Sequence, residues 1–349
     1  MLETPAYKGL LLQRPTKTGS TTLTSIFMRL AHSRAKTHPL NIARRSNGQN
    51  STAVVETTKK EEEDGDNDND DGVARRGFKV CKHRTNHGFG VKYGFDKRKK
   101  EHSFLTTIIR DPTSRAISRF FHFDVTVGQK VPTDVMFQRK LLEGHGYNPT
   151  VREINLRSDK YKLPRADQTD YDFSGVVQGI LEDYDLVVVL ERLDECLVLM
   201  KEILGLTIHE ILYLKARSGG AFSNGPNERP CVYIHPSFVT PGMDDFFRND
   251  TRWKARVYGD EMLVKAAYHS IDKTIDSLFE TRQDFEKELD RYRQALAYAQ
   301  EECKAEGKVV PMCDHAGVER RKPHTTCYIW MEGCDHQCLD DLVLPKQLQ

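Results

Sequence analysis

The chain has 349 residues, and its 52 lysines and arginines nearly balance its 51 aspartates and glutamates, for a formal net charge of +1 at pH 7. This length allows one large domain or two small ones with a sizeable core. A charge near zero gives no reason to expect nucleic acid as a partner, and no apolar run approaches the ~20 residues of a membrane span. The charge is uneven, because residues 56–71 carry a net charge of −7 and leave +8 for the rest.

A strand, a turn and a helix are predicted near the start of the sequence. Leu10 to Leu12 form an apolar run short enough for a buried strand, and a turn marked by Pro15 and Gly19 follows it. The residues after this turn predict a helix as far as about Ala31.

The turn is typical of an anion-binding site. The first N–H groups of a helix have no partner within it, and the helix dipole places partial positive charge there. The candidate residues, which add a lysine charge, a flexible glycine and several hydroxyl groups, are Lys17, Thr18, Gly19, Ser20, Thr21 and Thr22. The two glycines that precede the lysine in the P-loop of nucleotide triphosphatases are missing. An ordinary capped helix is the alternative interpretation.

A second strand, turn and helix are predicted from residue 104 onwards. Residues 104–109 are rich in β-branched side chains and predict a buried strand, and Pro112 suits the first turn of the following helix. Arg110 lies at the end of this strand, and Ser118 lies two turns along the helix.

Together the two units resemble sulfotransferases that use 3′-phosphoadenosine 5′-phosphosulfate (PAPS). The resemblance covers roughly residues 8–302, and it implies that the turn from Lys17 to Thr22 binds the 5′-phosphosulfate. It implies that Arg110 and Ser118 bind the 3′-phosphate. It also implies an α/β fold, a three-layer sandwich with a central parallel sheet like that of P-loop kinases.

A third polar segment is expected at the same place. Residues 78–81 predict a short strand, and the polar residues 82–88 follow it. Because parallel strands present ligands beyond their carboxyl ends, this segment is expected at the same sheet edge as Lys17 and Arg110.

The Cys-x-His element in this segment narrows the resemblance to galactose 3-O-sulfotransferases and the related uronosyl 2-O-sulfotransferases. In the latter a histidine at this place is the base, which implies His83 as the catalytic base and leaves His87 as a rival. A surface histidine in a basic loop is the alternative. Residues 186–204, a predicted buried strand and amphipathic helix, are also similar to the galactose 3-O-sulfotransferases.

The acidic part of the chain is expected to be a disordered insertion. Residues 37–77 are polar and lack periodicity, so they offer too little apolar surface to offset the entropy of ordering. Asp66, Asp68 and Asp70 alternate with other residues as in a calcium loop, but the glycine and closing glutamate of an EF-hand are absent.

The remaining segments suggest supporting roles. Residues 126–170 look polar and irregular and are expected to contact the acceptor, while Arg217 is a weaker candidate for closing over the donor. Apolar residues at steps of three, four or seven predict one long amphipathic helix over residues 271–302. This helix either packs on its own domain or forms a homodimer as a coiled coil.

Residues 303–349 form a cysteine-rich tail after the sulfotransferase domain of residues 1–302. Five of the eight cysteines lie in it, namely Cys303, Cys313, Cys327, Cys334 and Cys338. Disulfides of an oxidising lumen are the preferred interpretation, and Asn50 and Asn249 begin glycosylation sequons. A zinc site with His315, His324 or His336, and free thiols, are the alternatives.

The combined hypothesis is a carbohydrate sulfotransferase of the Golgi lumen, with its membrane anchor missing from this sequence; a cytoplasmic enzyme is the alternative. PAPS is the expected donor, and a glycan or glycolipid, such as one with a galactose 3-hydroxyl, is the expected acceptor. His83 would remove the acceptor proton while Lys17 stabilises the leaving phosphate, with no metal required. A P-loop phosphotransferase or hydrolase, and an inactive glycan-binding relative, remain as alternatives.

Overall fold

The computed structural model describes residues 9–37, 94–144, 146–164, 171–214, 219–223, 231–304, 313–319 and 335–349. Several sequence predictions lie outside these residues: most of the acidic insertion, the strand over residues 78–81, His83, His87 and Arg217.

The centre of the molecule is a three-stranded parallel sheet of order β1-β2-β3. Its strands are β1 (Gly9–Gln13), β2 (Ser103–Ile109) and β3 (Leu186–Val189). Nearly every residue of these strands is buried, as expected of parallel strands covered on both faces. The predicted α/β class and central parallel sheet are therefore confirmed.

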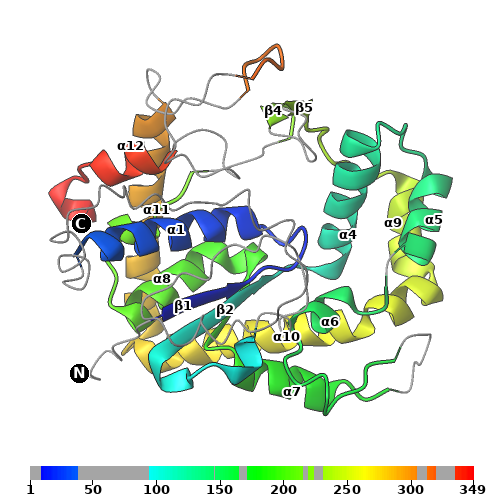
Figure 1. Cartoon of the computed structure of the whole chain (residues 1–349), viewed down its shortest axis with the longest axis horizontal. Helices are drawn as coiled ribbons and strands as arrows, with labels where there is room; N and C mark the ends of the chain where they lie inside the picture. The colour runs from blue at the N-terminus through cyan, green and yellow to red at the C-terminus, as the bar shows by residue number, and fades with distance from the viewer. Residues whose placement is uncertain are drawn as a thin grey trace, which may run out of the picture.

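Helices pack against both sides of the sheet. In Figure 1 the strands lie between α1 (Ser20–Thr37), drawn above them, and α10 (Thr251–Leu278), drawn below them. Helix α1 contacts β1, while α10 and α8 (Leu193–Leu204) contact β3. Two further helices, α7 (Ser174–Asp183) on α10 and α11 (Arg282–Lys304) on α8, complete the main core. The short 3-10 helices are Phe95–Lys97, Lys100–His102, Leu190–Arg192, His209–Ile211 and Lys346–Leu348.

A second group of helices, the helical lobe, lies beside the sheet, on the right in Figure 1. It contains α4 (Pro112–Phe120), a π-helical segment (Phe121–Val127), α5 (Asp134–Gly144), α9 (Pro241–Asn249) and the start of α10. Its separate core is rich in aromatic rings, with Phe120 and Phe137 in an edge-to-face contact at 5.0 Å. A small antiparallel hairpin, β4 (Phe222–Ser223) and β5 (Val232–Tyr233), lies nearby.

The expectation that residues 126–170 are irregular is wrong. They contain α5 and the short helix α6 (Pro149–Ile154). Phe137 and Leu141, one turn apart, are buried in the helical lobe, and Val151 and Ile154 are buried in the main core. These few apolar anchors suffice because each contacts residues distant in sequence, which a local hydrophobic pattern does not reveal.

The prediction of one long helix over residues 271–302 is also wrong. The chain leaves α10 at Phe279, whose backbone is extended, and α11 begins at Arg282. Thr281 stabilises the new start, because its Oγ1 accepts a hydrogen bond from the Asp284 N–H at 3.2 Å and donates to the Asp284 carboxylate at 2.7 Å. The predicted apolar stripe packs into the chain's own core. A homodimer through this segment would therefore have to use its outer, charged face.

The end of the chain is fastened to the main core. Disulfides join Cys303 to Cys338 and Cys231 to Cys313, which confirms disulfides for three of the five tail cysteines. Helix α12 (Asp335–Asp341) contacts α11, and Leu339, Leu344 and Leu348 enter the core. None of the helices described is both long and apolar enough to cross a membrane.

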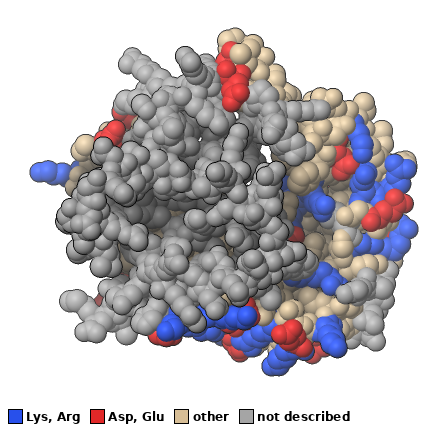
Figure 2. Space-filling model, in the orientation of Figure 1, with Lys and Arg blue, Asp and Glu red and all other residues tan. Residues whose placement is uncertain are grey.

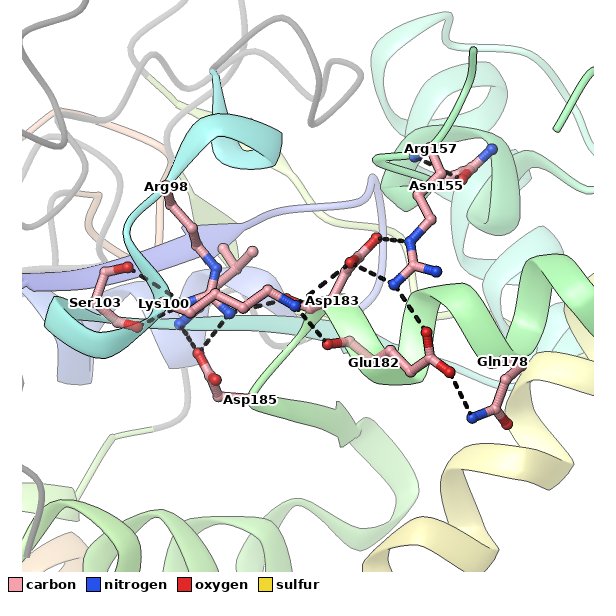
Figure 3. Close-up of polar contacts among 10 residues, drawn as sticks. Arg98, Lys100, Ser103, Asn155, Arg157, Gln178, Glu182, Asp183 and Asp185 are labelled. Atoms are coloured by element: carbon pink, nitrogen blue, oxygen red, sulfur yellow. Dashed lines mark hydrogen bonds and ion pairs between the residues drawn. The ribbon is translucent and has the colours of Figure 1, made fainter. Parts of the chain in front are cut away.

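At the amino ends of β2 and β3, Arg98, Lys100 and Arg157 converge on Asp183 and its acidic neighbours (Figure 3). Arg98 forms an ion pair with Asp185 at 2.9 Å and donates hydrogen bonds to the carbonyls of Ser103 and Asp183. Arg157 donates two hydrogen bonds to the Asp183 carboxylate, at 2.8 and 2.9 Å. We call Arg98, Lys100, Arg157, Glu182, Asp183 and Asp185 the amino-edge network. It ties the start of β2 to the end of α7 and the start of β3.

Candidate functional site

The turn between β1 and α1 contains two residues with left-handed backbones. Lys17 and Gly19 both have left-handed backbones, with φ of 64° and 78°. The left-handed backbone favours glycine at position 19, and a Cβ there would lie 2.5 Å from Leu190 Cδ1 and force that side chain to shift. Thr18 is buried, and its hydroxyl donates to the Pro15 carbonyl at 2.9 Å. The left-handed Lys17 is a strained conformation, of the kind that collects at functional sites.

Adjacent strands bring this turn and Arg110 to the same edge of the sheet. β1 and β2 are parallel, and Gln13 pairs with Thr107 in their register. The first turn residues and Arg110 therefore follow the carboxyl ends of neighbouring strands, as the sequence predicted. The position corresponds to the edge at which open parallel sheets bind ligands.

Arg110 is held at this edge by the residues after β3. Its Nε lies 3.9 Å from the Glu191 carboxylate, which also accepts a hydrogen bond from the Asp111 N–H at 3.1 Å. Burial lowers the pKa of Arg110, while Glu191 and Asp111 oppose that shift. Its side chain is 27% exposed, while its Nε is buried and has no hydrogen-bond partner among the described residues.

Helix α4 begins directly after Arg110 for local reasons. The Asp111 carboxylate accepts a hydrogen bond from the Ser114 N–H at 2.7 Å and caps the helix, and Pro112 occupies its first turn. Ser118 is half-buried, six residues beyond Pro112 and about 9 Å along the helix axis from it. It therefore lies in the last turn of α4, whereas Arg110 is at the sheet edge.

The two sequence motifs are in direct contact through a pair of residues that the sequence analysis missed. Arg115 on α4 donates from Nε to the Thr16 carbonyl at 2.8 Å, and the Thr16 N–H donates to the Glu153 carboxylate at 3.1 Å. Arg115 and Glu153 also pair with each other at 2.8 Å. The sequence signal for Arg115 was its position in α4 beside Pro112, Ala116 and Phe120, which form the buried face of this helix.

Two buried carboxyl groups near this contact have shifted pKa values. Burial raises the pKa of Glu153, and the neighbouring Arg115 opposes the rise. Burial likewise raises the pKa of Asp260, against Arg115 and the N–H groups of Thr150 and Val151.

An open hollow of about 330 Å³ lies next to the turn. It is lined by Thr22, Tyr213, Arg293 and residues 190–195. Asp194 in its wall accepts a hydrogen bond from the Tyr213 hydroxyl at 3.2 Å and lies 3.6 Å from Arg293 Nε. Of the residues from Lys17 to Thr22, only Thr22 lines this space.

Within the described residues, no group of three or more histidine, cysteine, aspartate or glutamate side chains is arranged to hold a metal ion. His83 and His87 lie outside those residues. Comparisons of the chain with family models, with curated proteins and with solved structures find no match.

Proposed function

We propose that the chain is a carbohydrate sulfotransferase, which moves the sulfuryl group of PAPS to a hydroxyl of a glycan or glycolipid. The observation that carries the proposal is the contact between the two motifs, in which Arg115 of the Arg110 helix bonds to Thr16 of the Lys17 turn. It supports one binding site for a ligand with two anionic groups, and PAPS has such groups at its 5′ and 3′ positions.

In the proposed reaction the acceptor hydroxyl attacks sulfur in line with the bond to the leaving phosphate. Lys17 and the first N–H groups of α1 stabilise the charge that grows on that phosphate oxygen. Arg110 and Ser118 bind the 3′-phosphate, and His83 removes the acceptor proton. These roles belong with the three-layer, P-loop-kinase-like form of the α/β fold.

Charge and cysteine chemistry are compatible with this setting. Lysine and arginine side chains are spread over the helical lobe on the right of Figure 2, with acidic ones between them. The two disulfides support an oxidising compartment such as the Golgi lumen.

Calorimetric titration separates this proposal from the phosphotransferase alternative. We expect tight binding of 3′-phosphoadenosine 5′-phosphate without magnesium, and weak binding of ATP with magnesium. Arg110→Ala should weaken binding of the bisphosphate more than binding of adenosine 5′-phosphate, because the lost contact is to the 3′-phosphate. Preference for ATP with magnesium would favour a phosphotransferase.

A second experiment tests the base. His83→Ala should lower turnover by ~10²-fold or more and leave binding of 3′-phosphoadenosine 5′-phosphate nearly unchanged, whereas His87→Ala should cost much less. The reverse result would make His87 the base. A wild-type protein that binds 3′-phosphoadenosine 5′-phosphate but sulfates no glycan acceptor would favour the inactive relative.

A further inference from the structure

The anion-binding turn is held from outside by charged residues that are distant in sequence. Thr16, the residue before the left-handed Lys17, has both of its backbone polar groups bonded to side chains. Its N–H donates to Glu153 of α6, and its carbonyl accepts from Arg115 of α4. These two groups belong to the peptide units on either side of Thr16, so each unit is held by one hydrogen bond and the chain enters Lys17 with its orientation fixed.

Arg115 and Glu153 form a single unit in which Arg115 is buried and the Glu153 side chain is 17% exposed. Arg115 is 4% exposed, and its three donor nitrogens are directed to the Thr16 carbonyl, the Thr150 hydroxyl at 2.7 Å and the Glu153 carboxylate at 2.8 Å. A guanidinium is suited to this arrangement because its planar fork offers several donors in fixed directions. We call Arg115, Glu153 and Thr150 the turn clamp.

The turn clamp is anchored to the longest helix described in the molecule. The Asp260 carboxylate of α10 accepts hydrogen bonds from the N–H groups of Thr150 and Val151, at 3.0 and 2.8 Å. The Asn148 side chain accepts from the N–H groups of Gly259 and Asp260. Helix α6 is therefore fixed to α10, and it carries Glu153 to the turn.

We propose that Arg115 and Glu153 are positioning residues that hold the Lys17 turn in its left-handed, anion-binding conformation. The use of this turn for PAPS rests on the proposed function, whereas the restriction of its backbone does not. Without the turn clamp, Lys17 would relax toward the commoner right-handed or extended backbone, and its ammonium group and the nearby N–H groups would lose their common focus. Binding of PAPS would then be weakened by the free energy needed to restore the turn's conformation.

The test uses Glu153→Gln, with Arg157→Gln as its matched control. Both wild-type residues belong to ion pairs at 2.8 Å, but Arg157 lies in the amino-edge network. In Glu153→Gln one carboxylate oxygen becomes an NH2 group. The side chain then faces either Thr16 or Arg115 with a donor in place of an acceptor. Thr150→Val is a milder variant, which removes one acceptor of Arg115 and keeps the side-chain volume.

Two measurements are made on each full-length variant, together with the free energy of unfolding. The first is hydrogen exchange of a peptide that covers residues 13–19, which needs no ligand. The second is the dissociation constant of 3′-phosphoadenosine 5′-phosphate. We expect Glu153→Gln to speed exchange at the turn and to weaken binding about tenfold or more, since charge-assisted hydrogen bonds are lost. Thr150→Val should shift both in the same direction by less.

The control should change neither measurement, even where it lowers stability as much as Glu153→Gln does. Unchanged exchange at residues 13–19 in both turn-clamp variants would overturn the proposal, as would an increase no greater than in the control. Failure of the wild type to bind the bisphosphate would instead contradict the proposed function, and the exchange data would still decide the role of the turn clamp.

Discussion

The two edges of the parallel sheet both carry arginine–carboxylate groups, but these groups hold different things. At the amino edge, Arg98 and Arg157 bond to acidic residues and carbonyls that flank strands and α7, so they fix regular elements (Figure 3). At the carboxyl edge, Arg115 and Glu153 hold the backbone of a single turn residue. The same chemistry therefore serves stability at one edge and the shape of a candidate ligand site at the other.

The largest effect is expected from Arg98→Ala at the amino edge. Arg98 has a side chain that is only 2% exposed, and its removal leaves two carbonyls without this donor and leaves the Asp185 carboxylate with the Leu105 N–H but no positive partner among the described residues. The free energy of unfolding should fall by about 3–5 kcal/mol, as for other broken buried pairs.

Urea denaturation measures this change, with Arg252→Ala as the control. Arg252 is 65% exposed and pairs with Asp250, so solvent screens the pair and its loss should cost far less than the loss of Arg98. Donor binding by folded Arg98→Ala should equal that of the wild type. Weaker donor binding by fully folded Arg98→Ala would show that the two edges are coupled.

Lys17→Ala should reverse this pattern at the carboxyl edge. Under the proposed function Lys17 acts on charge that grows in the transition state, so turnover should drop by ~10²–10³-fold with little change in unfolding free energy. The control is Lys100→Ala, another lysine near a strand end but in the amino-edge network. Equal turnover of the two variants would remove Lys17 from the chemistry.

The pH dependence of stability should have opposite signs at the two edges. Burial raises the pKa of Glu153, so its contribution to unfolding free energy should increase as the pH falls through its folded pKa. Hydrogen bonds from Gln178 and Arg157 lower the pKa of Glu182, so its contribution is lost as the pH falls through its folded pKa.

Denaturation between pH 7 and about pH 3 compares the wild type with Glu153→Gln and Glu182→Gln, because the lowered pKa of Glu182 places its loss below about pH 4.5. As the pH falls, the wild type should gain unfolding free energy relative to Glu153→Gln. It should lose unfolding free energy relative to Glu182→Gln. The same sign for both variants would contradict the contrast between the edges.

The smallest effect is expected in the unfolding free energy of Lys100→Ala. Lys100 Nζ lies 3.7 Å from the Asp183 carboxylate and donates to the Glu182 carbonyl, but its side chain is 57% exposed. Solvent screens such pairs, so the loss should be at most about 1 kcal/mol by thermal or urea denaturation. A loss near that of Arg98→Ala would mean that the amino-edge network acts as one cooperative unit.

The sequence by itself determined the elements whose causes are local. An apolar run predicted β1, β-branched residues predicted β2, and the pattern after β3 gave the observed start and end of α8. The placement of Lys17 and Arg110 at one edge followed from the rules for parallel strands. The helix break at Phe279 also had a local signal, the Thr281 and Asp284 capping pair, which the long apolar stripe outweighed.

Tertiary structure alone decided which distant residues meet. Glu153 is 137 residues from Thr16, and Cys231 is 82 residues from Cys313. A propensity or a periodic pattern describes neighbours within a few residues, whereas these partners are selected by how α6, α10 and the tail pack. For this reason the turn between β1 and α1 could be predicted from its own sequence, but its contacts with Arg115 and Glu153 could not.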